Sequence, residues 1–139
     1  MECPFCKLVK ERIGLVYSST YFSAFLDKSP VFYGHTLLVP NDHIETIFDL
    51  KGEAAKDLAH SLSLISQAVK NATSSDGILI VQNNIVSQSV PHLHFHIIPR
   101  KHNDGLKHFL WPRLKYKEGE KEKYEKLIIE QINKLNGNS

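Results

Sequence analysis

The chain has 139 residues, of which 42% are hydrophobic, and its net charge is +2 with histidines counted as neutral. This length and composition predict one globular domain with a substantial hydrophobic core. The weak positive charge gives no reason to expect a nucleic-acid or membrane partner, and no apolar run approaches the roughly 20 residues of a membrane span. The first residues lack the basic and apolar stretches of a signal peptide, so we expect a cytoplasmic protein.

Two cysteines, Cys3 and Cys6, stand in a C-x-x-C arrangement near the N-terminus. In a cytoplasmic chain this spacing indicates half of a metal site or a redox pair before it indicates a structural disulfide. A thioredoxin-like motif follows a strand within a βαβ pattern, and no strand pattern precedes Cys3. The spacing therefore favours a metal, and histidines would be the missing ligands.

The first half of the chain predicts three strands and a long helix. Two short strands are expected over 15–19 and 21–27, and a third over 34–40 is ended by a proline. Apolar residues at helical spacing then predict a helix from Asp49, the expected N-cap, to about Asn71.

The second half predicts two more strands and a second helix. The strands are expected over 77–82 and 92–99, separated by a polar loop over 83–91. A C-terminal helix is expected over 120–135. The order of strands, helix, strands and helix predicts an α+β fold with a mostly antiparallel sheet and one long helix packed on it.

Three histidines, His92, His94 and His96, occupy alternate positions in the last expected strand. Successive side chains of a strand point to opposite faces, so the three imidazoles are predicted to share one face. Histidine titrates near neutral pH, and such a row can bind metal, transfer protons or act as a nucleophile.

The row alone permits three interpretations. A metal site made by the histidines, as in cupin-type oxygenases, would also need a carboxylate, and none lies between Ile85 and Asn103. A structural row, with each ring bonded to a carbonyl, explains one histidine better than three in phase. The third interpretation is nucleophilic catalysis at phosphorus. Polar residues elsewhere in the chain favour it, namely Asp27, His35, Asn83, Gln88 and Ser89.

The pattern His-φ-His-φ-His-φ-φ resembles the signature of the histidine triad (HIT) superfamily of nucleotide hydrolases and transferases. The resemblance extends from residue 3 to about residue 112 and includes several motifs in the family's order. These are Cys3-Pro4-Phe5-Cys6, 24–30, 34–40, Asp42-His43, 82–84, and Gln88-Ser89-Val90 leading into 92–100. It implies a single HIT-like domain over 1–139, with 112–139 as a C-terminal extension that carries the added helix.

The resemblance implies a role for each histidine of the row. His94 would attack the α-phosphorus and form a nucleotidyl-histidine intermediate, which water then hydrolyses. His96 would contact the phosphate near the bridging oxygen, and His92 would orient the neighbouring ring or bind zinc. His35 matches the family's fourth histidine, close to the triad.

The resemblance also implies the surroundings of the nucleotide. Asp27 matches the acid that binds the ribose, and Phe5 and Phe25 match residues that line the base pocket. The phosphate and leaving group would contact Asn83, Gln88 and Ser89. Ser87 stands where many family members carry glycine.

Some relatives, and the related galactose-1-phosphate uridylyltransferases, bind structural zinc. By resemblance its ligands here would be Cys3, Cys6, His43 and His92, a set that suits tetrahedral zinc. The resemblance further implies a homodimer, and Trp111-Pro112 resembles a Trp-Pro that reaches the partner subunit's site in some phosphoramidase-type members.

The expected activity is hydrolysis at the α-phosphate of a purine nucleotide derivative, either a nucleoside phosphoramidate or a dinucleoside polyphosphate. Two alternatives stay open. One is a nucleotide- or partner-binding module with negligible turnover, and the other is a nucleotidyl transferase.

Overall fold

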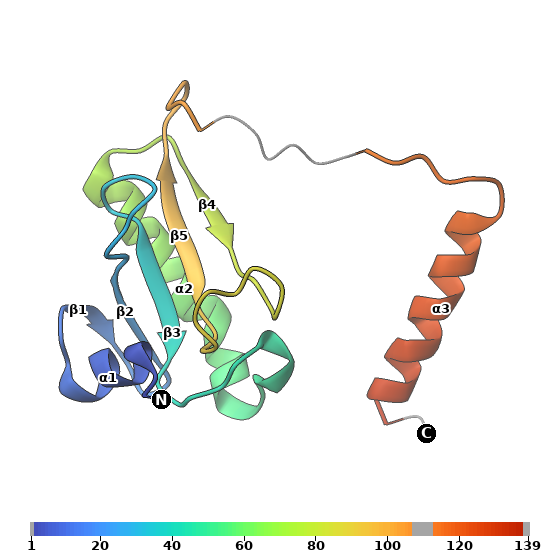
Figure 1. Cartoon of the computed structure of the whole chain (residues 1–139), viewed down its shortest axis with the longest axis horizontal. Helices are drawn as coiled ribbons and strands as arrows, with labels where there is room; N and C mark the ends of the chain where they lie inside the picture. The colour runs from blue at the N-terminus through green and yellow to red at the C-terminus, as the bar shows by residue number, and fades with distance from the viewer. Residues whose placement is uncertain (1, 107–112, 138–139) are drawn as a thin grey trace. The chain divides into compact units, whose positions relative to one another are not determined.

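The computed structural model describes residues 2–106 and 113–137. These residues form five strands, three α-helices and one 3-10 helix (Figure 1). In chain order the elements are α1 (Pro4–Glu11), β1 (Leu15–Ser18), β2 (Phe22–Leu26), β3 (Thr36–Pro40), η1 (Ile47–Asp49), α2 (Gly52–Thr73), β4 (Gly77–Val81), β5 (Phe95–Arg100) and α3 (Glu120–Leu135). No helix among the described residues is long and apolar enough to cross a membrane.

The chain divides into two compact units, residues 1–104 and 105–139. The first unit holds the whole sheet, and the second holds α3, an amphipathic helix whose side chains are at least partly exposed. The prediction of one domain with an extension from residue 112 stays a prediction. Trp111-Pro112 lies outside the described residues.

The strands form one antiparallel sheet in the order β1-β2-β3-β5-β4. Strand β5 lies between β3 and the edge strand β4 and pairs with both. Its His96 lies opposite Leu37 of β3 and Val81 of β4. The predicted α+β class with an antiparallel sheet is therefore confirmed.

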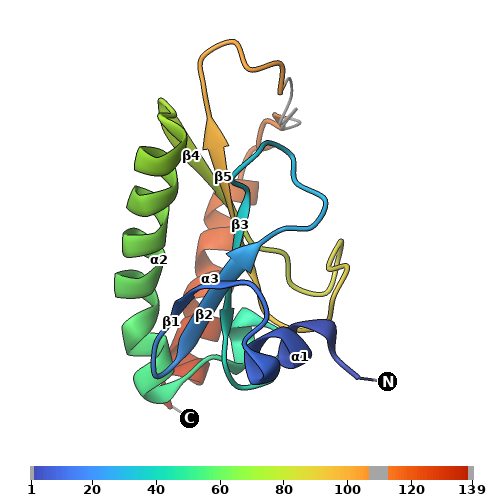
Figure 2. The same cartoon turned by 90° about the vertical axis from the view of Figure 1, so that its left-hand side faces the viewer.

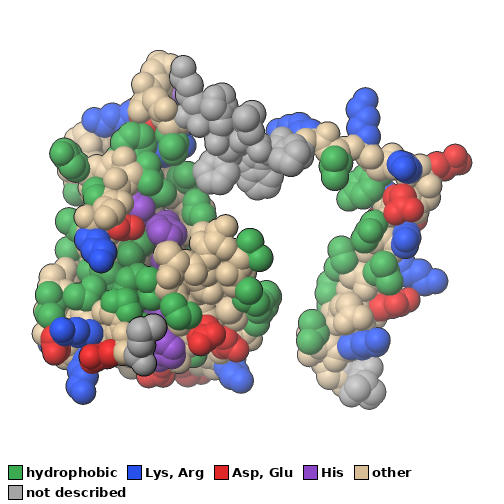
Figure 3. Space-filling view, in the orientation of Figure 1, with side chains coloured by type: hydrophobic (Ala, Val, Ile, Leu, Met, Phe, Trp, Pro, Cys, Tyr) green, Lys and Arg blue, Asp and Glu red, His purple; other side chains and the backbone are tan. Residues whose placement is uncertain are grey.

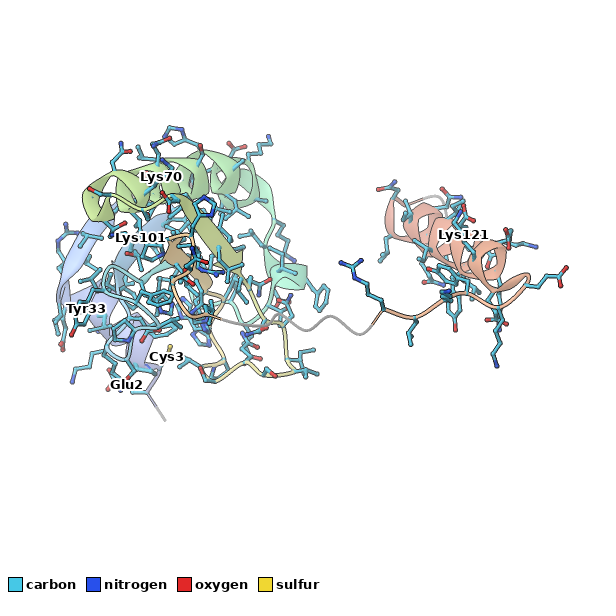
Figure 4. All side chains as sticks on the ribbon, turned by 90° about the horizontal axis from the view of Figure 1, so that it is seen from above. Glu2, Cys3, Tyr33, Lys70, Lys101 and Lys121 are labelled. Atoms are coloured by element: carbon cyan, nitrogen blue, oxygen red, sulfur yellow. The ribbon has the colours of Figure 1, made fainter. Side chains whose placement is uncertain are left out.

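A helix covers each face of this sheet (Figure 2). On one face α2 packs Ile65 and Val69 against a core from β2, β3, β5 and the segment before β5: Phe22, Ala24, Leu38, Leu93, Phe95 and Ile97. On the other face α1 packs Phe5 against Phe25, Leu37 and Val39. Figure 4 shows Lys70 of α2 and Cys3 before α1 on opposite sides of the sheet. Because both faces are covered, β3 is buried along its whole length.

Helix α1 has no counterpart among the sequence predictions, although its start carries a recognisable signal. Cys3 is the N-cap, and Pro4 occupies the first turn, where a missing N–H costs no hydrogen bond. Phe5 and Leu8 are three residues apart and face the sheet together.

The long helix begins at Gly52 rather than at Asp49, so the predicted N-cap is wrong. The carboxylate of Asp49 accepts hydrogen bonds from the backbone N and Oγ1 of Thr46, at 3.2 and 2.9 Å. Asp49 therefore closes the separate 3-10 turn η1 that precedes the helix.

The last strand begins at Phe95 rather than at residue 92. The N–H of Leu93 donates to the carbonyl of Ile44 at 2.8 Å, so the chain before Phe95 bonds to a loop and not to a neighbouring strand. The alternation nevertheless continues through the segment. Leu93 and Phe95 enter the core under α2, and the three histidines lie on the side of α1.

Gly34 precedes β3 with φ of +101°, a conformation that other residues rarely adopt. A Cβ atom at this position would lie 2.5 Å from Cγ2 of Thr73, in the last turn of α2. Thr73 is held in place because its Oγ1 donates to the carbonyl of Val69 at 2.7 Å. Only glycine fits this approach of the helix to the sheet.

Candidate active site and candidate metal centre

A cavity of about 630 Å³ lies between α1, the sheet and the loop that follows β2. Its apolar wall includes Phe5, Leu8, Phe25 and Leu37. Its other side carries polar and charged side chains, among them Lys7, Asp27, Lys28, Ser89, His94 and His96. Histidine side chains surface at two separate places on this face of the molecule, beside a hydrophobic area (Figure 3).

Phe5 joins the apolar wall to the histidines. Its ring centroid lies 5.3 Å from that of Phe25, 5.8 Å from that of His92 and 5.1 Å from that of His94. The rings of His94 and His96 are 5.0 Å apart. An apolar surface suited to a flat aromatic group therefore continues directly into the histidine row.

The backbone fixes which nitrogen of His94 carries the hydrogen. Nδ1 lies 2.7 Å from the carbonyl oxygen of His92, which can only accept, so Nδ1 is the donor. The lone pair of the neutral ring is then on Nε2, which makes no hydrogen bond to any described residue. His94 is buried but lines the cavity, so the ring is held in place with one nitrogen available for chemistry.

A second chain of hydrogen bonds fixes His35 and His96. The N–H of Val31 donates to Nδ1 of His35 at 3.0 Å, so His35 carries its hydrogen on Nε2 and donates it to Nδ1 of His96 at 2.9 Å. A carboxylate oxygen of Asp27 lies 3.6 Å from the same Nε2. His96 consequently carries its own hydrogen on Nε2, as a hydrogen-bond donor.

The surroundings keep both of these rings neutral at pH 7. Burial lowers the pKa of His96 to about 4, and the neighbouring His94 and His35 act in the same direction. Burial also lowers the pKa of His35, although the Asp27 carboxylate opposes it. His96 can therefore donate a hydrogen bond at neutral pH without carrying a charge.

The structure divides the predicted phosphate-contacting residues of the loop. Ser89 lines the cavity beside His94 and His96. The side chain of Gln88 instead accepts from the N–H of Ile85 at 3.0 Å and donates to the carbonyl of Glu45. Asn83 donates to the carbonyl of Ser87 at 3.3 Å. In this structure both amides hold the loop together and do not line the cavity.

Ser87 adopts φ of +62° in this loop, in the left-handed region that favours glycine. The sequence already singled out this position, because many relatives carry glycine there. Ile85 is also left-handed, with φ of +70°, which is unusual for a β-branched residue. Two of the five described non-glycine residues with positive φ therefore lie in the loop that carries Ser89.

The four residues of the predicted zinc site, Cys3, Cys6, His43 and His92, come together around Nδ1 of His92. Nδ1 of His92 lies 3.4 Å from Sγ of Cys3, 3.5 Å from Sγ of Cys6 and 3.2 Å from Nδ1 of His43. Sγ of Cys6 and Nδ1 of His43 are 3.3 Å apart. All four potential ligand atoms lie within 4.8 Å of one another.

The hydrogen bonds of His92 suit it to bind a metal. Its Nε2 lies 2.9 Å from the carbonyl oxygen of Pro40, which can only accept, so Nδ1 keeps the lone pair that faces the sulfurs. Burial, followed by contact with Cys3, raises the pKa of the Cys6 thiol to about 11. A cation would have to displace that proton, as metal ions do when they bind cysteine.

A second cluster of potential ligands, Asp27, His35 and His96, lies beside the cavity. A metal site built on the histidine row would need a carboxylate, and none lies between Ile85 and Asn103. In the fold, Asp27 supplies a carboxylate beside His96. The hydrogen-bond chain argues against a metal here, because the Nε2 of His35 that faces His96 carries the hydrogen. The set is better suited to hold one ring for hydrogen bonding.

Sequence reasoning missed several residues that line the cavity. Pro4, Lys7 and Leu8 belong to α1, which was not predicted, and Ile13 follows that helix. Lys28 and Ser29 come directly after the predicted Asp27. The proline at the start of α1 was the available signal for the first group.

The fold and the site together define a small α+β domain with a histidine cluster at the start of β5 in an antiparallel sheet. The family model of the HIT domain matches residues 11–103. The chain therefore belongs to the HIT domain family, which confirms the family suggested by the sequence motifs.

Several known proteins are similar to this chain over most of its length. An uncharacterized HIT-like protein of Saccharolobus solfataricus is 39% identical over 96% of this chain and 99% of its own length. An adenosine 5'-monophosphoramidase of Schizosaccharomyces pombe is 37% identical over 81% of this chain and 84% of its own length. The crystal structure of a HIT family member from Bacillus subtilis superposes with a TM-score of 0.85 at 32% identity, covering 94% of this chain and 96% of that one.

Proposed function

We propose that this chain is a nucleotide hydrolase that cleaves at the α-phosphate of a purine nucleotide derivative through a covalent bond to His94. The observation that carries the proposal is the tautomer of His94, whose Nδ1–H is held by a carbonyl and whose Nε2 keeps a free lone pair. The phosphoramidase among its relatives favours a nucleoside phosphoramidate over a dinucleoside polyphosphate as substrate.

In the proposed reaction, Nε2 of His94 forms a bond to the α-phosphorus as the bond from phosphorus to the leaving group breaks. The Nε2–H of His96 donates a hydrogen bond to the leaving atom, which departs with a proton from water. A second water then attacks phosphorus, gives its proton to the hydroxide left by the first, and releases the nucleoside monophosphate as the bond to Nε2 breaks and the lone pair returns to that nitrogen. The covalent intermediate divides one difficult displacement into two easier ones.

The cavity supplies a place for each other part of such a substrate. Phe5 and Phe25 offer aromatic surface for the base, and Asp27 offers an acceptor for ribose hydroxyls. Ser89 lies with His94 and His96 and can donate to a phosphate oxygen. Gln88 and Asn83 support this arrangement by bracing the loop.

Mass spectrometry of the protein after brief exposure to an adenosine phosphoramidate, and separately to a diadenosine polyphosphate, tests the proposal. We expect an adenylate adduct that maps to His94, together with released AMP, and the relative yields rank the two substrates. Bound nucleotide without adduct or AMP would support the binding module instead. Transfer of the adenylate to an added acceptor in preference to water would support the transferase.

We also propose that Cys3, Cys6, His43 and His92 bind a structural zinc ion. Two sulfurs and two imidazole nitrogens are a donor set that zinc prefers, and the Pro40 carbonyl already orients His92. A bound zinc would link the N-terminus to the body of the domain. Elemental analysis should give one zinc per chain in protein purified without chelator, and none in Cys6→Ser. The homodimer and the cytoplasmic location stay predictions.

A further inference from the structure

Helix α1 contributes to both sites at once. Cys3 and Cys6 belong to the candidate metal centre, and Phe5 between them forms part of the cavity wall. The N–H of Cys6 also donates to Sγ of Cys3 at 3.4 Å, which ties the first turn of the helix to the cluster. A movement of this turn would displace the cysteines and the aromatic wall together.

The polar attachment of α1 to the rest of the domain runs through the same two cysteines. Among the described residues, the hydrogen bonds from Cys3–Glu11 side chains to other parts of the domain all end at His43 or His92. Its remaining attachment is the packing of Phe5, Leu8 and neighbouring apolar residues. A helix of eight residues is too short to be stable alone.

His92 forms the second connection between the sites. Its side chain faces the cysteines through Nδ1, while its backbone carbonyl accepts the hydrogen bond that sets the tautomer of His94. The ring of Phe5 packs edge-on against the rings of both His92 and His94. The position of His94 therefore depends on a segment that the metal centre would hold.

We infer that metal binding at Cys3, Cys6, His43 and His92 and nucleotide binding in the cavity strengthen each other. This inference rests on the proposed function, which places the nucleotide beside Phe5 and His94. Cys3 and Cys6 then act as positioning residues, because they hold the aromatic wall in place before the nucleotide arrives. Preorganisation of this kind removes an ordering cost from the binding step.

Thermodynamic linkage makes the effect reciprocal. If zinc tightens AMP binding by some factor, AMP must tighten zinc binding by the same factor. Couplings between sites typically amount to about 5- to 150-fold in affinity, and the single shared helix predicts the lower part of that range.

Isothermal titration calorimetry on the full chain measures both directions. AMP is titrated into zinc-loaded and into chelator-treated protein, and zinc affinity is measured by competition with a chromophoric chelator, with and without saturating AMP. We expect AMP to bind about 5-fold or more tightly to the zinc-loaded protein, with the same factor for zinc. Hydrogen exchange supplies an independent measurement, because zinc should slow exchange of the α1 amides.

His43→Ala is the informative variant, since His43 is exposed, belongs to the metal cluster and does not line the cavity. It should abolish the effect of zinc on AMP affinity. His60→Ala removes an exposed histidine on α2 and should leave the effect unchanged.

The possible failures separate the two proposals. Equal AMP affinity with and without bound zinc, or no binding of zinc, would overturn the coupling while an adduct on His94 left the proposed function standing. Failure of both protein forms to bind AMP would overturn the proposed function and the coupling together.

Discussion

The two histidine clusters of this domain each take one histidine from the segment 92–96, yet their hydrogen bonds are arranged in opposite ways. In the cluster of Asp27, His35 and His96, donors and acceptors alternate, from the Val31 N–H through His35 to His96. In the cluster of Cys3, Cys6, His43 and His92, four potential ligand atoms converge within 4.8 Å, and only weak S–H donors are certain to lie between them.

This difference identifies the cluster that suits a cation. The alternating cluster is satisfied by its own hydrogens and can direct one Nε2–H toward a substrate. The converging cluster presents more lone pairs than hydrogens, and a metal ion resolves that arrangement. The two thiols of the second cluster already favour a metal by residue type, and the hydrogen bonds of the two clusters point the same way.

Replacing His94 by alanine should separate the clusters most sharply. The variant lacks the proposed nucleophile, so we expect turnover of an adenosine phosphoramidate to fall by at least about 10⁴-fold. AMP binding and zinc content should stay close to those of the wild type, because neither uses Nε2 of His94. Stopped assays of AMP release, calorimetry and elemental analysis measure the three quantities, and substantial remaining turnover would exclude His94 as the nucleophile.

Replacing His96 by alanine should have a smaller effect on the same reaction. The loss of one preorganised donor to the leaving atom is expected to lower kcat by about 10²–10³-fold. A substrate whose leaving group is a much weaker base needs less assistance, so its loss should be smaller. Equal losses across a series of leaving groups would contradict the assigned donor role.

Removing metal should affect stability before chemistry. Ligand binding to the folded state contributes about 4 kcal/mol when free zinc exceeds its Kd 1,000-fold, so chelation should lower the denaturation midpoint clearly. Cys6→Ser should be insensitive to chelator, whereas His60→Ala should respond like the wild type. An unchanged midpoint in chelated wild-type protein would remove the structural role of the metal.

Acidification should lower the stability of the protein through the cluster of Asp27, His35 and His96, by less than metal removal does. The pKa of His96 is lowered from 6.5 to about 4 in the folded protein, so between these values the unfolded chain binds more protons. The stabilisation is complete above about pH 6.5 and declines as pH falls toward about 4; the lowered pKa of His35 acts in the same direction. Denaturant titrations of metal-free protein at pH 7 and pH 5 measure this decline, which should be shallower in His96→Asn.

The sequence predicted the parts of the fold that depend on local pattern. The strands, the long helix and the C-terminal helix all form where hydrophobic spacing placed them, within a few residues. The two boundary errors have long-range or competing causes. Asp49 bonds back to Thr46 in place of capping α2, and Leu93 bonds to Ile44 in place of a sheet strand.

The candidate site was predicted in composition more than in geometry. The motifs singled out most of the side chains that the structure brings to the cavity and to the cysteine cluster. Nothing local in the sequence shows that Gln88 reaches the Glu45 carbonyl or that Asp27 lies beside His35. The tautomers depend on carbonyls and N–H groups whose positions only the folded backbone sets. The sequence motifs suggested different roles for His92 and His94 by resemblance, and the structure adds the hydrogen bonds that orient each ring.

Gly34 connects the candidate site to the packing on the opposite side of the sheet. Its missing side chain lets the last turn of α2 approach, and it immediately precedes His35. A single added methyl group would clash with Thr73. The end of α2 or the start of β3 would then have to move. The position of His35, and through its hydrogen bond that of His96, therefore depends on how closely α2 packs on the other face of the sheet.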